Sequence, residues 1–413
     1  MRSAGQFCAF NDVAILDAVR TPWVDVGGAL AQVSPIDLGI KVGREVLARS
    51  GLAPEAVDSV LAGSMAQASF DAYMLPRHIG LYSGVPQQVP ALAVQRICAT
   101  GFELLRQAGE QIGAGAQLAL CVGSESMSRN PIAAYSHRGG FRLGAPVEFK
   151  DFLWEALYDP APGLDMIATA ENLARRHGLS REAVDRFALA SHQLALQAQG
   201  SGWFDAEIVA VRNEVFELQG YQPRGIALPR RCEAVTADSH PRPTDLPALA
   251  RLTAIHPEGV QTAGNSCAVV DGAAAALVGR TCLSDRPPLA NLLATAVVGV
   301  APEFMGIGPV PAIQLLLQRT GLSLDAIGLF EINEAQGAQV LAVAQSLELE
   351  GERLNRRGGS IALGHPLAAT GLRLVLTLAR QLRERNLRYG IAAACVGGGQ
   401  GMAVLIENPD FRG

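Results

Sequence analysis

The sequence repeats itself, and this duplication constrains the fold more than any other feature of the chain. Three short segments recur in the same order, two of them at an offset of 270 residues and the third at 274. The pairs are 49–52 with 319–322, 99–102 with 369–372, and 121–123 with 395–397. Three repeated segments, in the same order and at nearly the same spacing, indicate that the chain contains two related halves.

Each half alternates segments typical of strands with segments typical of helices. Short apolar runs predict strands at 13–16, 57–61, 118–122, 327–332 and 390–396. Helical periodicity predicts helices at 38–50, followed by Gly51 as a stop signal, and at 371–381. Strand–helix alternation favours sheets covered by helices, so we predict an α/β fold.

The middle of the chain has a different character and is predicted to be an insertion. It contains helical stretches at 167–177 and 181–200, the second preceded by Ser180 as an N-cap, and loops with Pro and Gly. An insertion of this size on a scaffold usually shapes a binding site. The predicted units are a first half at 1–123 plus 252–285, an inserted domain at 124–251 and a second half at 286–413.

Charge and hydropathy limit the classes of function. The formal net charge is −5, lysine occurs only at Lys41 and Lys150, and no basic stripe is present, which argues against nucleic acid as a partner. An anionic ligand would therefore meet mainly arginine or backbone N–H groups. No apolar run is long enough to span a bilayer, and residues 1–11 lack the layout of a secretory signal. We expect a soluble, cytoplasmic protein.

Seven cysteines are scattered along the chain without a CxxC pair. They are Cys8, Cys98, Cys121, Cys232, Cys267, Cys282 and Cys395. This pattern argues against a disulfide framework and against a zinc ribbon, so we expect no metal. Most of these thiols are expected to be small buried side chains in a reducing compartment.

Cys98 is the first candidate for chemistry. An apolar segment precedes it, and Phe102, Leu105 and Ala108 follow with helical spacing. The thiol is therefore expected at or just before a helix N-terminus, where free N–H groups and the helix dipole favour a thiolate nucleophile. On position alone, a buried cysteine in a strand-to-helix turn fits equally well.

His365 lies between glycine-rich turns, just before the helix that repeats the helix after Cys98. If the two halves pack face to face about a pseudo-twofold axis, both side chains point into one site. His365 would then be a general base for the thiol. The alternative is a structural histidine.

Cys395 and Asn333 lie at the ends of two predicted strands. Cys395 precedes the glycine-rich segment 397–401, whose backbone N–H groups would bind an oxyanion. A plain tight turn closing the last hairpin is the alternative for this segment. Asn333 follows the strand 327–332, at an edge where ligands bind in sheet proteins, and the alternative is a helix N-cap.

Taken together, these segments resemble the thiolase family over nearly the whole chain. The ordered motifs include Cys-Ala-Thr-Gly at 98–101, Gly-Ser-Glu-Ser-Met-Ser at 123–128, Thr-Ala-Gly-Asn at 262–265, Asn-Glu-Ala at 333–335, Gly-His-Pro at 364–366 and Cys-Val-Gly-Gly-Gly at 395–399. Each motif is short, but the ordered set is specific. The resemblance implies a five-layered αβαβα thiolase fold of two halves with an inserted loop domain, assembled as a homodimer or homotetramer.

The resemblance also implies chemical roles. Cys98 would be the nucleophile that becomes acylated, His365 would activate it and help to stabilise a thioester oxyanion, and Cys395 would be the acid/base at the substrate α-carbon. Asn333 would hold a water near His365, and the backbone N–H groups of Cys98 and Gly397 would form a second oxyanion hole. Acyl-CoA and CoA would be substrates, without a bound cofactor.

Several residues differ from the usual family pattern at positions where the acyl chain and the pantetheine would be bound. The departures are Gln336 for Phe, Ala368 for Gly, Cys267 for Ser and Asp165 for His. The contacts implied for substrate and CoA are Arg242, Ser266, Cys267, Met166 and Gln336. Arg242 either meets the CoA nucleotide or is a solvated surface arginine. The acyl preference stays open.

The predicted function is an active thiolase, working either in fatty acid metabolism or in acetoacetyl-CoA synthesis. One alternative is a catalytically silent, thiolase-like CoA-binding or scaffold subunit, which the departures suggest. A second is a ketoacyl-synthase-like condensing enzyme, but such enzymes usually pair a cysteine with two histidines. Here Asn333 and Cys395 occupy the discriminating positions.

Overall fold

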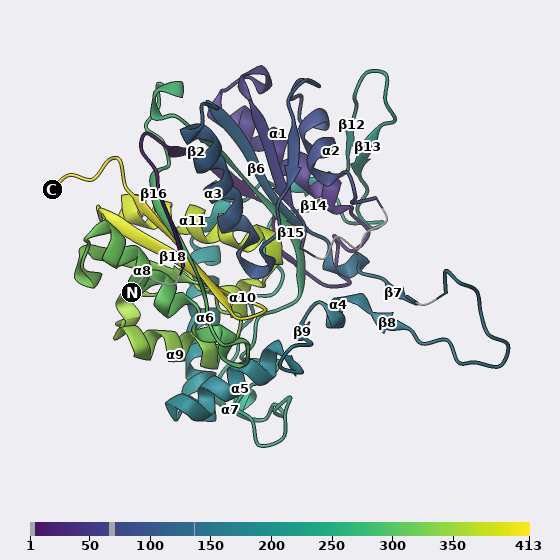
Figure 1. The fold of residues 1–413 in the computed structure, drawn as a ribbon, viewed down its shortest axis with the longest axis vertical. Helices are drawn as coiled ribbons and strands as arrows, with labels where there is room; N and C mark the ends of the chain where they lie inside the picture. The colour runs from purple at the N-terminus through teal and green to yellow at the C-terminus, as the bar shows by residue number, and fades with distance from the viewer. Residues whose placement is uncertain (1–4, 66–70, 136) are drawn as a thin grey trace.

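One large mixed sheet runs through the molecule (Figure 1). The computed structural model describes residues 5–65, 71–135 and 137–413. Residues 1–4 and 66–70 of the predicted first unit, and residue 136 of the predicted insertion, therefore lie outside the described residues. The sheet's eleven strands have the order β17-β18-β19-β16-β2-β15-β6-β4-β5, with β1 beside β16 and β3 beside β15. They are β1 (Gln6–Ala9), β2 (Ala14–Arg20), β3 (Val24–Asp25), β4 (Ser59–Gly63), β5 (Ala91–Ala93), β6 (Leu118–Glu125), β15 (Val270–Gly279), β16 (Ala290–Gly299), β17 (Ile327–Ile332), β18 (Tyr389–Val396) and β19 (Gln400–Glu407).

The two halves of the chain occupy the two ends of this sheet. Strands β2, β4, β5, β6 and β15 belong to the first half, and β16 to β19 belong to the second. The two ends meet where Ala290 and Asn291 of β16 pair with Ile15 and Ala14 of β2. The five predicted strands all correspond to strands of the sheet.

Helices cover both faces of the sheet. In the two halves they are α1 (Pro35–Ser50), α2 (Leu75–Tyr82), α3 (Thr100–Gly113), α8 (Pro309–Thr320), α9 (Gly337–Leu347), α10 (Ser360–Leu363) and α11 (Leu367–Glu384). The predicted stop of the first helix is confirmed, since Gly51 caps α1 in the left-handed conformation with φ 73°. The helix predicted at 371–381 begins earlier, at Leu367.

The three largest hydrophobic clusters hold five layers together. One core packs α1 and α2 against the first-half strands, a second places α3 and α11 between the two ends of the sheet, and a third packs α8 and α9 against β16 to β19. In β6, Leu120 and Val122 face the first core, whereas Ala119 and Cys121 face the second. A strand buried on both faces reads as one continuous apolar run. The layer order is αβαβα, as the fold class predicted.

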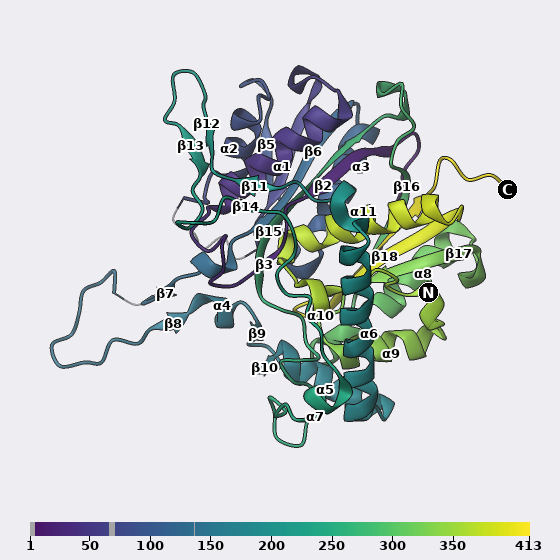
Figure 2. The same ribbon diagram turned by 180° about the vertical axis from the view of Figure 1, so that it is seen from behind.

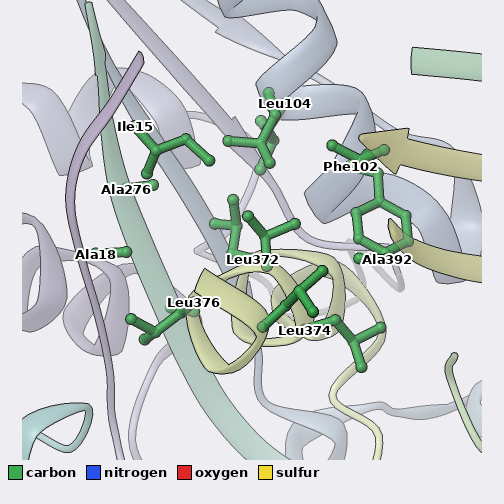
Figure 3. Packing of buried hydrophobic residues seen from close by; sticks show 14 of the residues in the cluster. Ile15, Ala18, Phe102, Leu104, Ala276, Leu372, Leu374, Leu376 and Ala392 are labelled. Atoms are coloured by element: carbon green, nitrogen blue, oxygen red, sulfur yellow. The ribbon is translucent and has the colours of Figure 1, made fainter. Parts of the chain in front are cut away.

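Helices α3 and α11 cross at two glycines that the duplication relates to each other. A Cβ on Gly101 would lie 2.6 Å from the backbone N of Leu372, and a Cβ on Gly371 would lie 2.5 Å from the backbone N of Phe102. No other residue permits so close an approach of the backbones. The crossing lies in the central core, where Leu372 of α11 packs with Phe102 of α3 and Ile15 of β2 (Figure 3). The N-termini of the two helices therefore lie near each other.

The segment predicted as an insertion contributes helices and short hairpins. It holds α4 (Phe152–Glu155), α5 (Met166–His177), α6 (Arg181–Gly200), α7 (Leu246–Ala250), and the strand pairs β7 (Ile132–Ala133) with β8 (Lys150–Asp151), β9 (Tyr158–Asp159) with β10 (Leu164–Asp165), β11 (Val211–Arg212) with β14 (Ala234–Val235), and β12 (Glu214–Phe216) with β13 (Arg224–Ile226). Ser180 caps α6, as predicted, by accepting a hydrogen bond from the backbone N–H of Ala183. Residues 137–149, between β7 and β8, form an arm that extends away from the body (Figures 1 and 2).

Candidate active site

Cys98 lies in a single 3₁₀ turn, Ile97–Ala99, that leads directly into α3. The position predicted for it, just before a helix N-terminus, is confirmed. Ile97 has φ 45°, in the left-handed region that β-branched residues rarely adopt. Strain of this kind persists only where the surrounding structure holds it, and it concentrates at functional sites. The turn places the Cys98 side chain in a buried position, with 7% of the residue exposed.

Burial dominates the acidity of the Cys98 thiol. It raises the pKa of Cys98 to about 11, although the backbone N–H groups of Gly397 and of Cys98 itself act in the opposite direction. The N–H groups favour the thiolate, as expected, but the cost of burying a charge exceeds the stabilisation that they provide. The thiol needs a base to become a nucleophile.

His365 supplies a neutral imidazole. Its Nδ1 lies 2.6 Å from Oγ1 of Thr370, and its Nε2 lies 3.3 Å from Nδ2 of Asn333. Burial, followed by the positive charge of Arg373, lowers the pKa of His365 to about 3. The unprotonated ring is therefore the resting form, and it can accept a proton.

Asn333 directly follows β17, and its backbone N–H donates to the carbonyl of Ala393 in β18. Its side-chain Oδ1 accepts a hydrogen bond of 2.7 Å from the hydroxyl of Ser360. Helix α9 begins only at Gly337, with Gln336 at the N-cap position, so the alternative interpretation of Asn333 as a helix cap is wrong. Its amide instead lies against His365.

Cys395 is fully buried near the end of β18, and Gly397 follows in the turn to β19. Gly398 and Gly399 have φ 81° and 80°, a conformation that glycine adopts without strain. Burial, followed by the proximity of the sulfurs of Cys98 and Cys267, raises the pKa of Cys395 well above its ordinary value. Three thiols that are remote from one another in the sequence thus lie near one another.

Two adjoining cavities open at these groups. A cavity of about 190 Å³ is lined by Cys98 and Gly397, and one of about 640 Å³ is lined by His365. Leu157, Met166 and Leu367 line both. The pair has an apolar interior with few polar groups, which is the character of a small-molecule site.

The larger cavity collects four of the five residues predicted to contact substrate. They are Ser266, Cys267, Met166 and Gln336. The fifth, Arg242, is exposed and does not line the cavity, but its guanidinium donates a 2.7 Å hydrogen bond to Nε2 of His240, which does. Within residues 5–65, 71–135 and 137–413, no group of three or more His, Cys, Asp or Glu side chains is placed to hold a metal ion.

Several residues of the site were not singled out in the sequence. Thr370 and Ser360 orient His365 and Asn333, and His256 pairs with Asp165 at 3.0 Å beside the larger cavity. The repeat could have indicated Thr370, because Thr100 is its equivalent in the first half. The hydroxyl of Thr100 donates to the backbone carbonyl of Ile97, in the turn that carries Cys98. Ser360 and His256 carry no such signal, since their partners are remote in the chain.

The family models for the thiolase N-terminal and C-terminal domains match residues 13–281 and 286–408. The chain belongs to the thiolase family, and the protein is an acyltransferase. It is 41% identical to the mitochondrial 3-ketoacyl-CoA thiolase of Bos taurus over 96% of this chain and 98% of the relative. It is 40% identical to the β-ketoadipyl-CoA thiolase of Pseudomonas aeruginosa over 96% and 99% of the two chains.

A solved structure has the same architecture. Human mitochondrial 3-ketoacyl-CoA thiolase in complex with CoA superposes with a TM-score of 0.89 at 38% identity, covering 98% of each chain. In the described part of our chain, none of the helices combines the length and apolar character that crossing a bilayer requires.

Proposed function

We propose that the protein transfers acyl groups between coenzyme A thioesters through an acyl group carried on Cys98. It would cleave a 3-ketoacyl-CoA with CoA and run the reverse condensation. The observation that supports this most is that Cys98 and His365 line two adjoining cavities, while the buried thiol of Cys395 lies close to the sulfur of Cys98. A thioester is the natural acyl carrier here, because cysteine accepts the acyl group without losing thioester energy.

In the cleavage direction, Nε2 of His365 takes the proton of Cys98 as its sulfur attacks the 3-keto carbon. The bond between the α- and β-carbons breaks, and the departing acetyl-CoA enolate takes a proton from the thiol of Cys395. The thiol of CoA then gives its proton to the Cys395 thiolate and attacks the acyl-Cys98 thioester. The expelled Cys98 sulfur takes its proton back from His365, which restores the enzyme.

Two sets of donors would stabilise the developing oxyanions. The backbone N–H groups of Cys98 and Gly397 already lie at the Cys98 sulfur and would meet the oxygen of the acyl-enzyme intermediate. His365 and a water held by Asn333 would meet the thioester oxygen of the leaving enolate. Removing one such donor typically costs a factor of about 10² to 10³ in rate.

The larger cavity would hold the pantetheine arm and part of the acyl group. Ser266, Cys267, Met166 and Gln336 line it, and Arg242 lies outside, at a position suited to a phosphate of CoA. The human relative was solved with CoA bound, which supports CoA as the carrier here. The names of the relatives differ in acyl group, so both a linear 3-ketoacyl chain and a carboxylated one are candidates.

Steady-state kinetics would test this function. We expect CoA-dependent cleavage of acetoacetyl-CoA or of a longer or carboxylated 3-ketoacyl-CoA, and no cleavage by a Cys98→Ser variant. Gln336→Phe restores the usual family residue and should shift the preference within the series. Tight binding of acyl-CoA without turnover and without acylation of Cys98 would instead favour the silent CoA-binding subunit. Condensation that requires a malonyl group on acyl carrier protein would favour the ketoacyl-synthase-like alternative.

We also propose that the chain assembles as a homodimer or homotetramer. Strand β5 lies at the end of the sheet with Leu92 47% exposed, and the arm carries exposed Phe141, Leu143 and Phe149. Apolar side chains of this kind are unfavourable in water unless a partner covers them. Light scattering of the purified protein would overturn the proposal if it gave the mass of one chain.

A cytoplasmic location remains part of the proposal. The seven cysteines are all free, which suits a reducing compartment, whereas the bovine relative is mitochondrial by name. Fractionation of the source cells with an antibody to the native protein would decide between the two.

A further inference from the structure

A continuous chain of hydrogen bonds leads from a buried arginine to the reactive histidine. Arg373 Nη2 lies 3.4 Å from Oγ of Ser360, and that oxygen lies 2.7 Å from Oδ1 of Asn333. The other end of the Asn333 amide faces Nε2 of His365, and Nδ1 of His365 faces Thr370. All five side chains are at most 4% exposed.

The number of protons that each group can donate fixes the donor and the acceptor in each of these hydrogen bonds. A guanidinium can only donate, so Ser360 accepts from Arg373, and the single hydroxyl proton of Ser360 goes to Oδ1 of Asn333. The amide nitrogen of Asn333 is thereby turned toward Nε2 of His365, which must present a lone pair. The ring proton is then on Nδ1.

The hydrogen bonds of Thr370, on the other side of the His365 ring, are consistent with this assignment. The hydroxyl of Thr370 donates to the backbone carbonyl of Pro366 at 3.0 Å, so its oxygen accepts from Nδ1 of His365. The opposite orientation of the Asn333 amide would place its NH₂ against Ser360. The proton of that hydroxyl would then lack an acceptor among the described residues, and a buried unpaired donor is costly.

We propose that Ser360, oriented by Arg373, is a positioning residue that fixes the amide of Asn333 and so holds His365 in the Nδ1–H tautomer. This tautomer leaves Nε2 unprotonated, which is the state that the proposed function needs in the acceptor of the Cys98 proton. The inference rests on the proposed function for its catalytic consequence but not for the tautomer itself. The sequence gives no hint of the link, since Ser360 and Asn333 are 27 residues apart.

The direct test is the ¹⁵N spectrum of the wild-type protein labelled at histidine, with the His365 signals assigned by their loss in a His365→Gln variant. We expect a protonated Nδ1 and an unprotonated Nε2. A protonated Nε2 with a bare Nδ1 would overturn the proposal. The measurement needs no turnover, so it remains decisive if the proposed function fails.

Kinetics of Ser360 variants test the positioning role. We expect Ser360→Ala to lower kcat about five- to tenfold with little change in KM, the effect of losing one neutral hydrogen bond, and Ser360→Thr to restore most of the rate. Ser124→Ala is the matched control, because Ser124 is as fully buried and donates only to the backbone carbonyl of Pro35. Unchanged kcat in Ser360→Ala, or an equal loss in Ser124→Ala, would contradict a positioning role.

Discussion

At the scale of single residues, the site keeps its reactive groups neutral until substrate arrives. Burial raises the pKa of Cys98 to about 11 and lowers that of His365 to about 3, so thiol and imidazole are both uncharged near pH 7. Proton transfer between them creates two charges together, each beside hydrogen-bonding partners that favour its charged form. Gly397 donates to the thiolate, and Thr370 accepts from the imidazolium.

The first prediction at this scale concerns pH. Iodoacetamide should modify Cys98 slowly at pH 7 and faster as the pH rises toward 11, because the thiolate fraction increases about tenfold per pH unit below a raised pKa. Peptide mass spectrometry over a pH series measures the rate, with Cys98→Ala identifying the peptide. A rate that has already reached its plateau below pH 8 would show that the thiol is not held neutral.

The second prediction concerns Thr370. Thr370→Val preserves shape but leaves Nδ1–H of His365 without its acceptor, so we expect kcat to fall by about tenfold to a hundredfold while the protein stays folded. Thr320→Val is the matched control, because Thr320 donates to the carbonyl four residues earlier, as Thr370 does, but lies on α8 away from the site. Equal activity of the two variants would contradict the role of Thr370.

At the scale of elements, the crossing of α3 and α11 brings the two halves of the site together. We predict that Gly101→Ala destabilises the protein by about 1–3 kcal/mol or more, because its methyl group would lie 2.6 Å from the backbone of α11. Gly113→Ala, at the other end of α3, has open space around it and should leave the stability unchanged or slightly higher. Urea unfolding of both variants is the measurement, and similar stabilities would contradict the account.

Sequence patterns predicted the elements well and their local distortions poorly. Continuous apolar runs marked β6 and β18, and the end of α1 followed from Gly51, because these signals are local. The positive φ of Ile97 could not be read from the sequence, since the surrounding fold imposes it against the preference of the residue. The hydrogen bond from Ser360 to Asn333 could not be predicted either, because its two residues are remote in the chain.

At the scale of the whole molecule, the duplication predicted the architecture because the two halves share one core. Helix α11 of the second half and α3 of the first pack in that core, with residues from both ends of the sheet around them. The raised pKa of Cys98 could not be predicted from the sequence, because the extent to which the thiol is buried depends on the assembled fold. The repeat predicted that Cys98 and His365 lie just before equivalent helices, but it gave no information on how their protons are held.

In the proposed function Cys98 carries the acyl group, and intact mass spectrometry can detect this acyl-enzyme. The wild-type protein and a Cys98→Ala variant would be exposed briefly to acetyl-CoA and to a longer acyl-CoA, then quenched in acid. We predict that the wild type alone gains the mass of one acyl group, located on the peptide that contains Cys98. Acylation of the variant to the same extent, or of neither protein by any acyl-CoA, would contradict covalent catalysis at Cys98.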